Sequence, residues 1–230
     1  MKKTEEKKVI NLFCILAKYG SRKTTYLSRI LLDKELIEKC NLELLIYGTT
    51  RRKRDDAIDG DMFEYYSEEE FKKIDDSELV EFRSYYTVDQ QTVYYFTKSE
   101  SIKNADKNFI CIASPYQYEQ YRQWIAKENI KEQYEKYRLF AILIQDNLRS
   151  RMYQILEETK DEDELKLYDI CRQILQEKGE FADVLGRIPE LKHPMTSKTV
   201  CFIDGNEYYE RDYFEDNLKD IKAFIKKNTN

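Results

Sequence analysis

An apolar run that stops abruptly at a basic turn sets the strongest limit on the fold of this chain. Residues 10–17 read Ile-Asn-Leu-Phe-Cys-Ile-Leu-Ala, residues 18–25 read Lys-Tyr-Gly-Ser-Arg-Lys-Thr-Thr, and a helical pattern begins at Thr24. A strand, a tight turn ending in Lys-Thr and a helix form an arrangement that holds nucleotide phosphates, because loop amides and the helix N-terminus face the anion. We therefore interpret residues 17–24 as a candidate phosphate loop.

The candidate loop departs from the pattern G-x-x-x-x-G-K-[ST], which would place glycines at Ala17 and Arg22. Glycine suits such a loop because it reaches positive φ and lets the backbone approach phosphate closely. Arg22 must therefore take a strained conformation or belong to a reshaped loop, and the alternative is a strand-turn-helix with a solvated basic turn. The candidate nucleotide-binding residues are Gly20, Ser21, Arg22, Lys23, Thr24 and Thr25, with Thr24 also the candidate Mg²⁺ ligand.

Length and charge restrict the class of protein. A chain of 230 residues suffices for one α/β domain with a small insertion. Its 39 basic and 44 acidic residues leave a formal charge of −5 without a basic bias, so no nucleic acid partner is expected. The start lacks the cleavage pattern of a secretory signal, and no apolar run is long enough to span a bilayer. We expect a cytoplasmic protein without a membrane partner, and the oligomeric state stays open.

Cysteine and histidine usage argues against metal and disulfide chemistry. The five cysteines are widely spaced without a C-x-x-C pair, and His193 is the one histidine of the chain. Neither a zinc site nor a disulfide framework is expected from such a set. We expect buried free thiols, and His193 at the surface rather than in a catalytic role.

Periodicity predicts strands that alternate with helices. Strands are expected at 10–17, 42–47, 79–87, 92–97, 109–113, 139–144 and 200–203, and helices at 24–40, 68–74, 116–127, 147–158, 162–178 and 213–226. Asp-Gln-Gln at 89–91 divides two of the strands as in a hairpin, and Ser67 is the expected cap of the helix at 68–74. Such alternation is typical of an α/β fold with a mainly parallel sheet flanked by helices, and the β segments clustered between about residues 48 and 97 indicate a small β-rich insertion.

Four segments downstream of the loop form an ordered series. They are Thr-Thr-Arg-Arg-Lys-Arg at 49–54, Asp-Gly-Asp-Met-Phe-Glu-Tyr-Tyr at 59–66, Ser-Glu-Glu-Glu-Phe at 67–71 and Tyr-Tyr-Phe-Thr at 94–97. The series resembles the pattern of the guanylate kinase family, which is T-T-R-x-x-R, then x-G-x-x-Y-x-F-[VY], a short acidic helix with a central Phe, a strand carrying Glu, and Y-Y-G-[ST]. In order and spacing, residues 8–178 resemble this family, and within it a divergent bacterial branch.

The resemblance implies a P-loop nucleoside monophosphate kinase, which transfers a phosphoryl group from ATP, with Mg²⁺, to GMP, dGMP or a related nucleoside monophosphate. It implies one guanylate kinase-like domain over residues 1–230. Within that domain it implies an acceptor-binding subdomain at 48–98, and a helical lid with its following helix at 145–178.

The resemblance also assigns roles in the acceptor-binding subdomain. Arg51, Arg54 and Tyr95 would bind the acceptor phosphate, and two arginines three residues apart can grip a phosphate with forked donors. Glu81 would read guanine, because a carboxylate accepts from N1–H and the exocyclic amine together, a donor pair that adenine lacks. Thr97 would contact the base.

The resemblance assigns further cationic side chains to catalysis. Lys23 would steady the transferred group, and Arg149, Arg151 and Arg172 resemble lid arginines that close over ATP. Such cations spread the charge that develops on the phosphoryl oxygens, so that positioning and electrostatics supply most of the rate.

Three departures from the family pattern stand beside these matches. Tyr47 replaces a serine of the family, and Phe63 occupies the substrate-site position of its phosphate-binding tyrosine, so two hydroxyl contacts of the family are missing. The acidic Asp-x-Asp of the family falls on Ile-Ala-Ser at 112–114, which leaves no carboxylate there for Mg²⁺ or guanine.

Two other functions stay open at this point. A catalytically inactive guanylate kinase-like module that binds a nucleotide or a phosphopeptide is suggested by Ala17, Arg22 and Ser114, whereas Lys23 and Thr24 favour the kinase. A protein-interaction unit without a nucleotide has support only from the abundant tyrosines.

Overall fold

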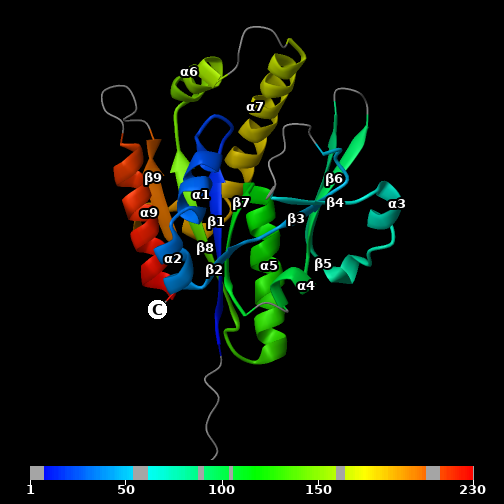
Figure 1. The fold of residues 1–230 in the computed structure, drawn as a ribbon, viewed down its shortest axis with the longest axis vertical. Coiled ribbons are helices and arrows are strands. Elements are labelled where there is room, and N and C mark those ends of the chain that lie inside the picture. Colours follow the sequence, from blue (N-terminus) through cyan, green and yellow to red (C-terminus); the bar gives the residue numbers. More distant parts are fainter. Residues whose placement is uncertain are drawn as a thin grey trace, which may run out of the picture. The chain divides into compact units, whose positions relative to one another are not determined.

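Two β-sheets organise the chain (Figure 1). The structure, a computed structural model, describes residues 8–53, 62–87, 91–103, 106–158, 164–205 and 213–229. The chain divides into two units, one formed by Met1–Glu43 with Lys107–Asn230 and the other by Leu44–Asp106. Each unit holds one of the sheets and is described by itself below.

The sheet of the first unit has five strands. Their order is β2 (Leu42–Leu44), β7 (Asn108–Ala113), β1 (Ile10–Ala17), β8 (Tyr137–Gln145) and β9 (Val200–Asp204). β1 pairs in parallel with β7 and β8, and β9 pairs in parallel with β8. All side chains of β1 are buried, which explains its nearly unbroken apolar sequence, because a central parallel strand is covered on both faces. The carboxyl ends of β1, β8 and β9 therefore meet at one edge.

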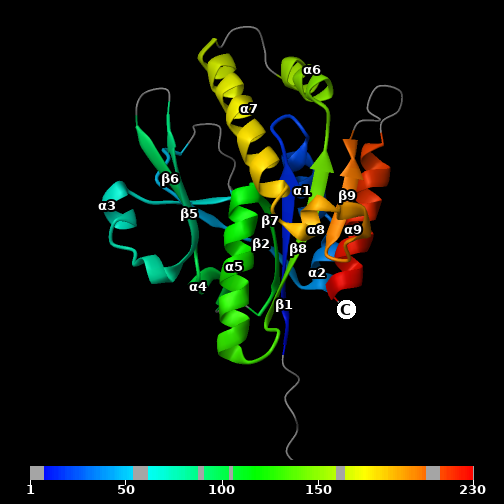
Figure 2. The same ribbon diagram turned by 180° about the vertical axis from the view of Figure 1, so that it is seen from behind.

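Helices cover both faces of this sheet. Figures 1 and 2 show α1, α2 and α9 on one face and α5, α7 and α8 on the other. The helices are α1 (Lys23–Leu31), α2 (Lys34–Cys40), α5 (Pro115–Glu132), α6 (Leu148–Glu158), α7 (Glu164–Leu185), α8 (Pro189–Lys192) and α9 (Phe214–Thr229). The predicted mainly parallel sheet flanked by helices is thereby confirmed. No helix among the described residues is both long and apolar enough to cross a membrane.

The second unit holds a four-stranded sheet. Its order is β4 (Phe63–Tyr65), β3 (Tyr47–Thr49), β6 (Thr92–Lys98) and β5 (Leu79–Tyr86). β5 and β6 form the predicted antiparallel hairpin, β3 runs antiparallel to β6, and β4 runs parallel to β3. The short helices of this unit are α3 (Glu68–Phe71), α4 (Glu100–Lys103) and the 3₁₀ turn η1 (Asp76–Glu78).

Two elements that the sequence predicted as continuous are each divided in the structure. The helix expected at 24–40 is two helices, because the Asp33 carboxylate accepts from the backbone N–H of Leu36 and starts α2 anew. The strand expected at 42–47 is also divided, since β2 joins the first sheet and β3 the second.

The remaining element predictions differ mainly at their ends. The helix expected at 68–74 starts at the predicted cap, where Ser67 and Glu70 form a capping box, but it ends at Phe71. α5 and α7 extend beyond their predicted ends. The connection at 185–197 contains α8 and the 3₁₀ turn η2 (Pro194–Thr196).

The five cysteines all lie among the described residues and form no disulfide, but the prediction that they are buried holds for three of them. Cys14, Cys40 and Cys111 are buried, whereas Cys171 is exposed on α7 and Cys201 is half-buried on β9. His193 is exposed, as expected.

Candidate functional site

The predicted phosphate loop joins the carboxyl end of β1 to the N-terminus of α1. Gly20 has φ of +81°, and an added Cβ would lie 2.9 Å from the backbone oxygen of Arg151. Glycine is therefore required for both its backbone conformation and the close approach of α6. Arg22 makes no side-chain cap to α1, so the first N–H groups of this helix are not satisfied by it.

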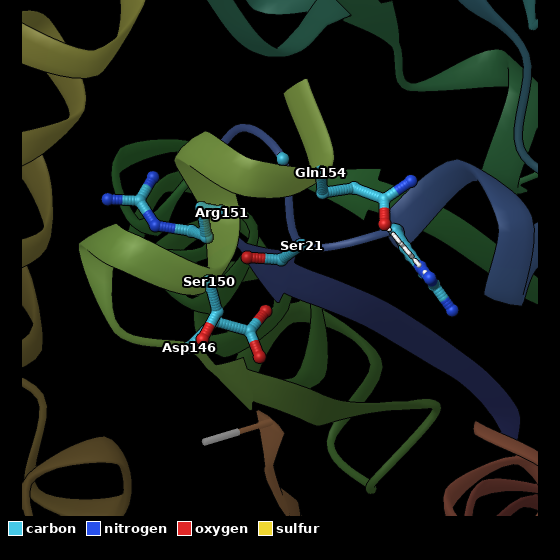
Figure 3. A pocket seen from close by; sticks show the side chains of 7 residues that line it. Ser21, Asp146, Ser150, Arg151 and Gln154 are labelled. Carbon is cyan, nitrogen blue, oxygen red and sulfur yellow. Dashed lines mark hydrogen bonds between the residues drawn. The ribbon is translucent and has the colours of Figure 1, made fainter. Parts of the chain in front are cut away.

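Arg22 takes the strained backbone conformation, which was one of the two alternatives that the sequence allowed. It has φ of 52° and ψ of 23°, the left-handed conformation, which costs a residue with a side chain on the order of 1–3 kcal/mol. Its Nε and Nη2 donate to Oε1 of Gln154 on α6, at 3.0 and 2.9 Å (Figure 3). This forked contact offsets part of the strain and fastens α6 to the loop.

Lys23 is the first residue of α1, and its ammonium group turns back towards the loop. Nζ donates to the backbone oxygen of Ala17 at 3.2 Å and lies 3.6 Å from Oε1 of Glu177 on α7. The lysine side chain is 22% exposed. The loop lysine thus lies at the loop and faces an acidic group.

The Glu177 carboxylate on α7 lies against the loop. Its Oε2 accepts from the backbone N–H of Tyr19 at 2.6 Å and lies 3.7 Å from Nη1 of Arg151. A loop amide and two cations, Lys23 and Arg151, therefore converge on one negatively charged group. These are the donor types that bind phosphate at helix N-termini and P-loops.

Positive charge is concentrated around the loop. Burial lowers the pKa of Lys18, the nearby Arg151 guanidinium lowers it further, and the Glu177 carboxylate counteracts both. Together with Arg22 and Lys23, these side chains place four cations near one bend of the chain. The pKa of Lys18 is lowered mainly because burial disfavours its charged form, and the neighbouring guanidinium adds to this effect.

Among the three predicted lid arginines, Arg151 forms a hydrogen bond to the loop. Nη1 donates to the backbone oxygen of Tyr19 at 2.9 Å, and the residue is 5% exposed. Arg149 is exposed on the first turn of α6, and Arg172 is half-buried on α7. Thr24 and Thr25 are exposed at the start of α1.

A half-buried carboxylate lies beside the loop at the carboxyl end of β8. Figure 3 shows Asp146 and Ser21 facing each other in a pocket also lined by Ser150, Arg151 and Gln154. Burial raises the pKa of Asp146, and Asp204 at the end of β9 raises it further, while Ser21 and Arg151 act in the opposite direction. Asp146 thus brings a carboxylate to the loop from β8, whereas residues 112–114 carry none.

In the second unit, the predicted substrate residues gather on one face of the sheet. Glu81 pairs with Thr97 across β5 and β6, and the Thr97 hydroxyl donates to Oε1 of Glu81 at 2.9 Å. Both residues are buried, at 3% and 0% exposure. Tyr95 lies on the same face, two positions before Thr97. We call the face carrying Arg51, Phe63, Glu81, Arg83, Tyr95 and Thr97 the polar face.

The Thr-Thr-Arg segment is fastened to β6 by its threonines. Thr49 Oγ1 donates to the backbone oxygen of Tyr94 at 2.9 Å and accepts from the backbone N–H of Arg51 at 3.1 Å. The hydroxyl of Thr50 accepts from the backbone N–H of Tyr94 at 2.9 Å. The Arg51 guanidinium lies 5.1 Å from the ring centroid of Phe63. The two threonines thus set the position of the arginine, while Arg54 lies outside the described residues.

The opposite face of this sheet is apolar and is covered by α3. Phe71, the last residue of α3, stacks on Tyr94 with ring centroids 4.4 Å apart, and contacts Phe96 with centroids 5.0 Å apart. Because side chains alternate along a strand, packing Phe82, Tyr94 and Phe96 against Phe71 directs Glu81, Arg83, Tyr95 and Thr97 to the other side.

Comparison with known proteins rests on structure. No family model matches the chain, and no curated protein matches it in sequence. Among solved structures, the crystal structure of guanylate kinase from Anaplasma phagocytophilum is similar, with a TM-score of 0.52 over 98% of this chain and 88% of that chain, at 12% sequence identity. The chain has a guanylate kinase-like fold. At this identity the similarity concerns the fold alone, which agrees with the expected P-loop type of sheet.

Within the guanylate kinase-like fold, three notable residues were missed by reasoning from the sequence. Asp146 had a usable signal, since a carboxylate directly after an apolar strand lies at the sheet edge where the loop lies. The signal for Arg83 was weaker: it lies two residues after Glu81 on a predicted strand, so that both side chains share a face. Glu177 had none, because its approach to Tyr19 depends on the course of α7.

Proposed function

We propose that this protein transfers the γ-phosphoryl group of ATP to a nucleoside monophosphate, with GMP or dGMP as the acceptor. The observation that carries the proposal is the anion site of the loop. There the Glu177 carboxylate accepts from Tyr19 N–H at 2.6 Å and lies 3.6 Å from Lys23 and 3.7 Å from Arg151. A site that holds a carboxylate in this way offers the donors that a phosphate needs.

The residues of the loop fit the phosphates of ATP. The Glu177 carboxylate serves as a stand-in anion, and Gly20 allows the backbone to bend closely around it. Lys23 and Arg151 would hold the phosphates, and the exposed hydroxyl of Thr24 would face the bound Mg²⁺. ATP with Mg²⁺, when bound, supplies the phosphoryl group and neutralises part of its charge.

The polar face would hold the acceptor. Arg51 and Tyr95, together with Arg54, would bind its phosphate through charge-assisted and neutral hydrogen bonds. Glu81 would accept from two donors of guanine, and Thr97, which already donates to Glu81 Oε1, would keep the carboxylate in a single orientation. A buried carboxylate discriminates strongly, because a base without matching donors leaves it unsatisfied.

Cations supply the catalytic contribution in this proposal. Phosphoryl transfer needs positioning and charge stabilisation more than a protein base. Lys23 and Arg151, which lie at the loop, would stabilise the charge on the transferred group, and Arg149 and Arg172 would contribute from α6 and α7.

A coupled assay of ADP release tests the proposal. ATP and Mg²⁺ are supplied with GMP, dGMP, AMP, UMP or CMP, and we expect turnover with GMP or dGMP. Lys23→Ala should lower turnover about 100-fold or more, because one charge-stabilising donor is lost. Lys39→Ala, which removes an exposed lysine paired with Glu35 on α2, is the matched control and should leave turnover unchanged.

Two results would contradict the proposal. One is the absence of turnover with every monophosphate together with no ATP binding in calorimetry, which would instead support a binding module. The other is equal turnover by the wild type and Lys23→Ala, which would place the chemistry away from the loop.

A further inference from the structure

Arg83 lies on the polar face although no sequence motif pointed to it. It follows Glu81 by two residues on β5, and its partner across the ladder is Tyr95. Its guanidinium lies 5.1 Å from the ring centroid of Tyr85 and 5.5 Å from that of Tyr95. Cation–π contacts with two rings restrain the guanidinium group, and its planar fork of donors distinguishes arginine from lysine.

The placement of Arg83 repeats that of Arg51. Arg51 lies over Phe63, Arg83 lies over Tyr95, and the rings of Phe63 and Tyr95 contact each other edge to face with centroids 5.6 Å apart. Two guanidinium groups therefore flank one pair of aromatic rings on the same face of the sheet.

Both guanidinium groups carry a donor that no described residue satisfies. The Nε atoms of Arg51 and Arg83 are buried, and neither has a hydrogen-bond partner among the residues that the structure describes. A buried charged donor without an acceptor is costly, and arginine offers five donors and no acceptor. An anion bound by the two guanidinium groups would supply acceptors for their donors.

We propose that Arg83 is a phosphate-binding residue of the acceptor site, which contacts the phosphate monoester of the acceptor from the Tyr95 side while Arg51 contacts it from the Phe63 side. This inference rests on the proposed function, because it assumes that the acceptor is a nucleoside monophosphate. It makes phosphate recognition depend on a residue between Glu81 and the hairpin turn, and it separates the face into a base-reading row, Glu81 with Thr97, and a phosphate row, Arg83 with Tyr95.

The test compares binding of GMP, guanosine and inorganic phosphate to the wild type, Arg83→Gln and Arg83→Lys. Calorimetry measures GMP and guanosine, and the shift of protein NMR signals measures phosphate. Arg83→Gln should weaken the binding of GMP about tenfold or more, because a charge-assisted fork to phosphate is lost. The affinity for guanosine, which has no phosphate, should stay within about twofold of the wild type. The affinity of Arg83→Lys for GMP should lie between those of the wild type and Arg83→Gln, since lysine keeps the charge and lacks the fork.

Arg52→Gln is the matched control. Arg52 is exposed in the same unit, so this variant removes the same charge without touching the ring pair, and it should bind GMP as the wild type does. Melting temperatures of all variants show whether a loss of binding reflects a loss of folding.

Several results would overturn the inference. GMP binding that is unchanged in a folded Arg83→Gln variant excludes a phosphate contact, and equal weakening of GMP and guanosine assigns Arg83 to the base or to the sheet. If the wild type binds no nucleoside monophosphate, the proposed function fails. The phosphate titration then still decides on Arg83, because equal phosphate affinity in the wild type and Arg83→Gln rejects its role.

Discussion

The backbone N–H of Tyr19 donates a hydrogen bond of 2.6 Å to Oε2 of Glu177, a residue 158 positions later in the chain. The same carboxylate pairs with Lys23 and Arg151, so an internal anion lies in a loop built from donors and cations. A nucleotide phosphate that binds here must compete with this carboxylate. The contact therefore links the affinity of the loop for phosphate to the position of α7.

Glu177→Gln should tighten the binding of ATP. Glutamine keeps an oxygen that accepts from Tyr19 N–H but loses the attraction to Lys23 and Arg151, so the internal competitor becomes weaker. Because these ion pairs are partly exposed, we expect an increase of about threefold to tenfold, which calorimetry at fixed Mg²⁺ and ionic strength can measure.

The control for this variant is Glu132→Gln at the end of α5, where an exposed glutamate pairs with Lys136. It removes an equal charge at the opposite edge of the sheet and should not alter ATP affinity. An unchanged or lower ATP affinity in Glu177→Gln would show that the carboxylate does not compete with the ligand.

Glu81→Gln should weaken the binding of GMP far more than the binding of ATP. The substitution keeps the shape of the side chain and an acceptor for Thr97 but turns one acceptor oxygen into a donor, which opposes the amine of guanine. We expect a loss of about tenfold or more for GMP and less than twofold for ATP, measured by calorimetry. Glu69→Gln, on the exposed side of α3, is the control, and equal losses for both nucleotides would remove Glu81 from the base site.

Asp146→Asn should make stability depend less on pH. Burial raises the pKa of Asp146, so its stabilising contribution is complete below the ordinary pKa of aspartate and is lost as pH rises through the higher pKa of the folded state. The asparagine variant has no charge to bury, and relative to the wild type it should gain stability between acidic and neutral pH. Urea unfolding at several pH values measures this, with Asp183→Asn as an exposed control on α7. A parallel pH dependence of the two proteins would contradict the prediction.

Cys171 should be the one thiol that reacts rapidly with a disulfide reagent in the folded protein. It is exposed, whereas Cys14, Cys40 and Cys111 are buried, and burial together with the Asp220 carboxylate raises the pKa of Cys201 to about 12. Absorbance of released thiolate should show one fast equivalent, and all five in denaturant. Cys171→Ser should abolish the fast phase and Cys201→Ser should leave it; a fast phase that survives Cys171→Ser would be the contrary result.

Local sequence signals account for much of the fold. β1, the loop and the start of α1 followed from an apolar run that ends at a basic turn, and the β5–β6 hairpin followed from two β-like runs with polar residues between them. The cap of α3 at Ser67 was predictable because its hydrogen bonds join residues three apart. The break at Asp33 was missed, since the apolar spacing of the two helices continues across it.

The residues of the candidate site divide in the same way. The alternation of side chains along β5 and β6 is a property of the sequence, and it alone determined that Glu81 and Arg83 share a face, as do Tyr95 and Thr97. The apolar and basic pattern likewise determined that Lys23 follows a buried strand. The contact of Glu177 with Tyr19, the fork between Arg22 and Gln154, and the rings on either side of Arg83 were decided only by the tertiary structure. The reason is physical: periodicity sets the direction of a side chain relative to its own helix or strand, whereas its partner depends on how distant elements pack.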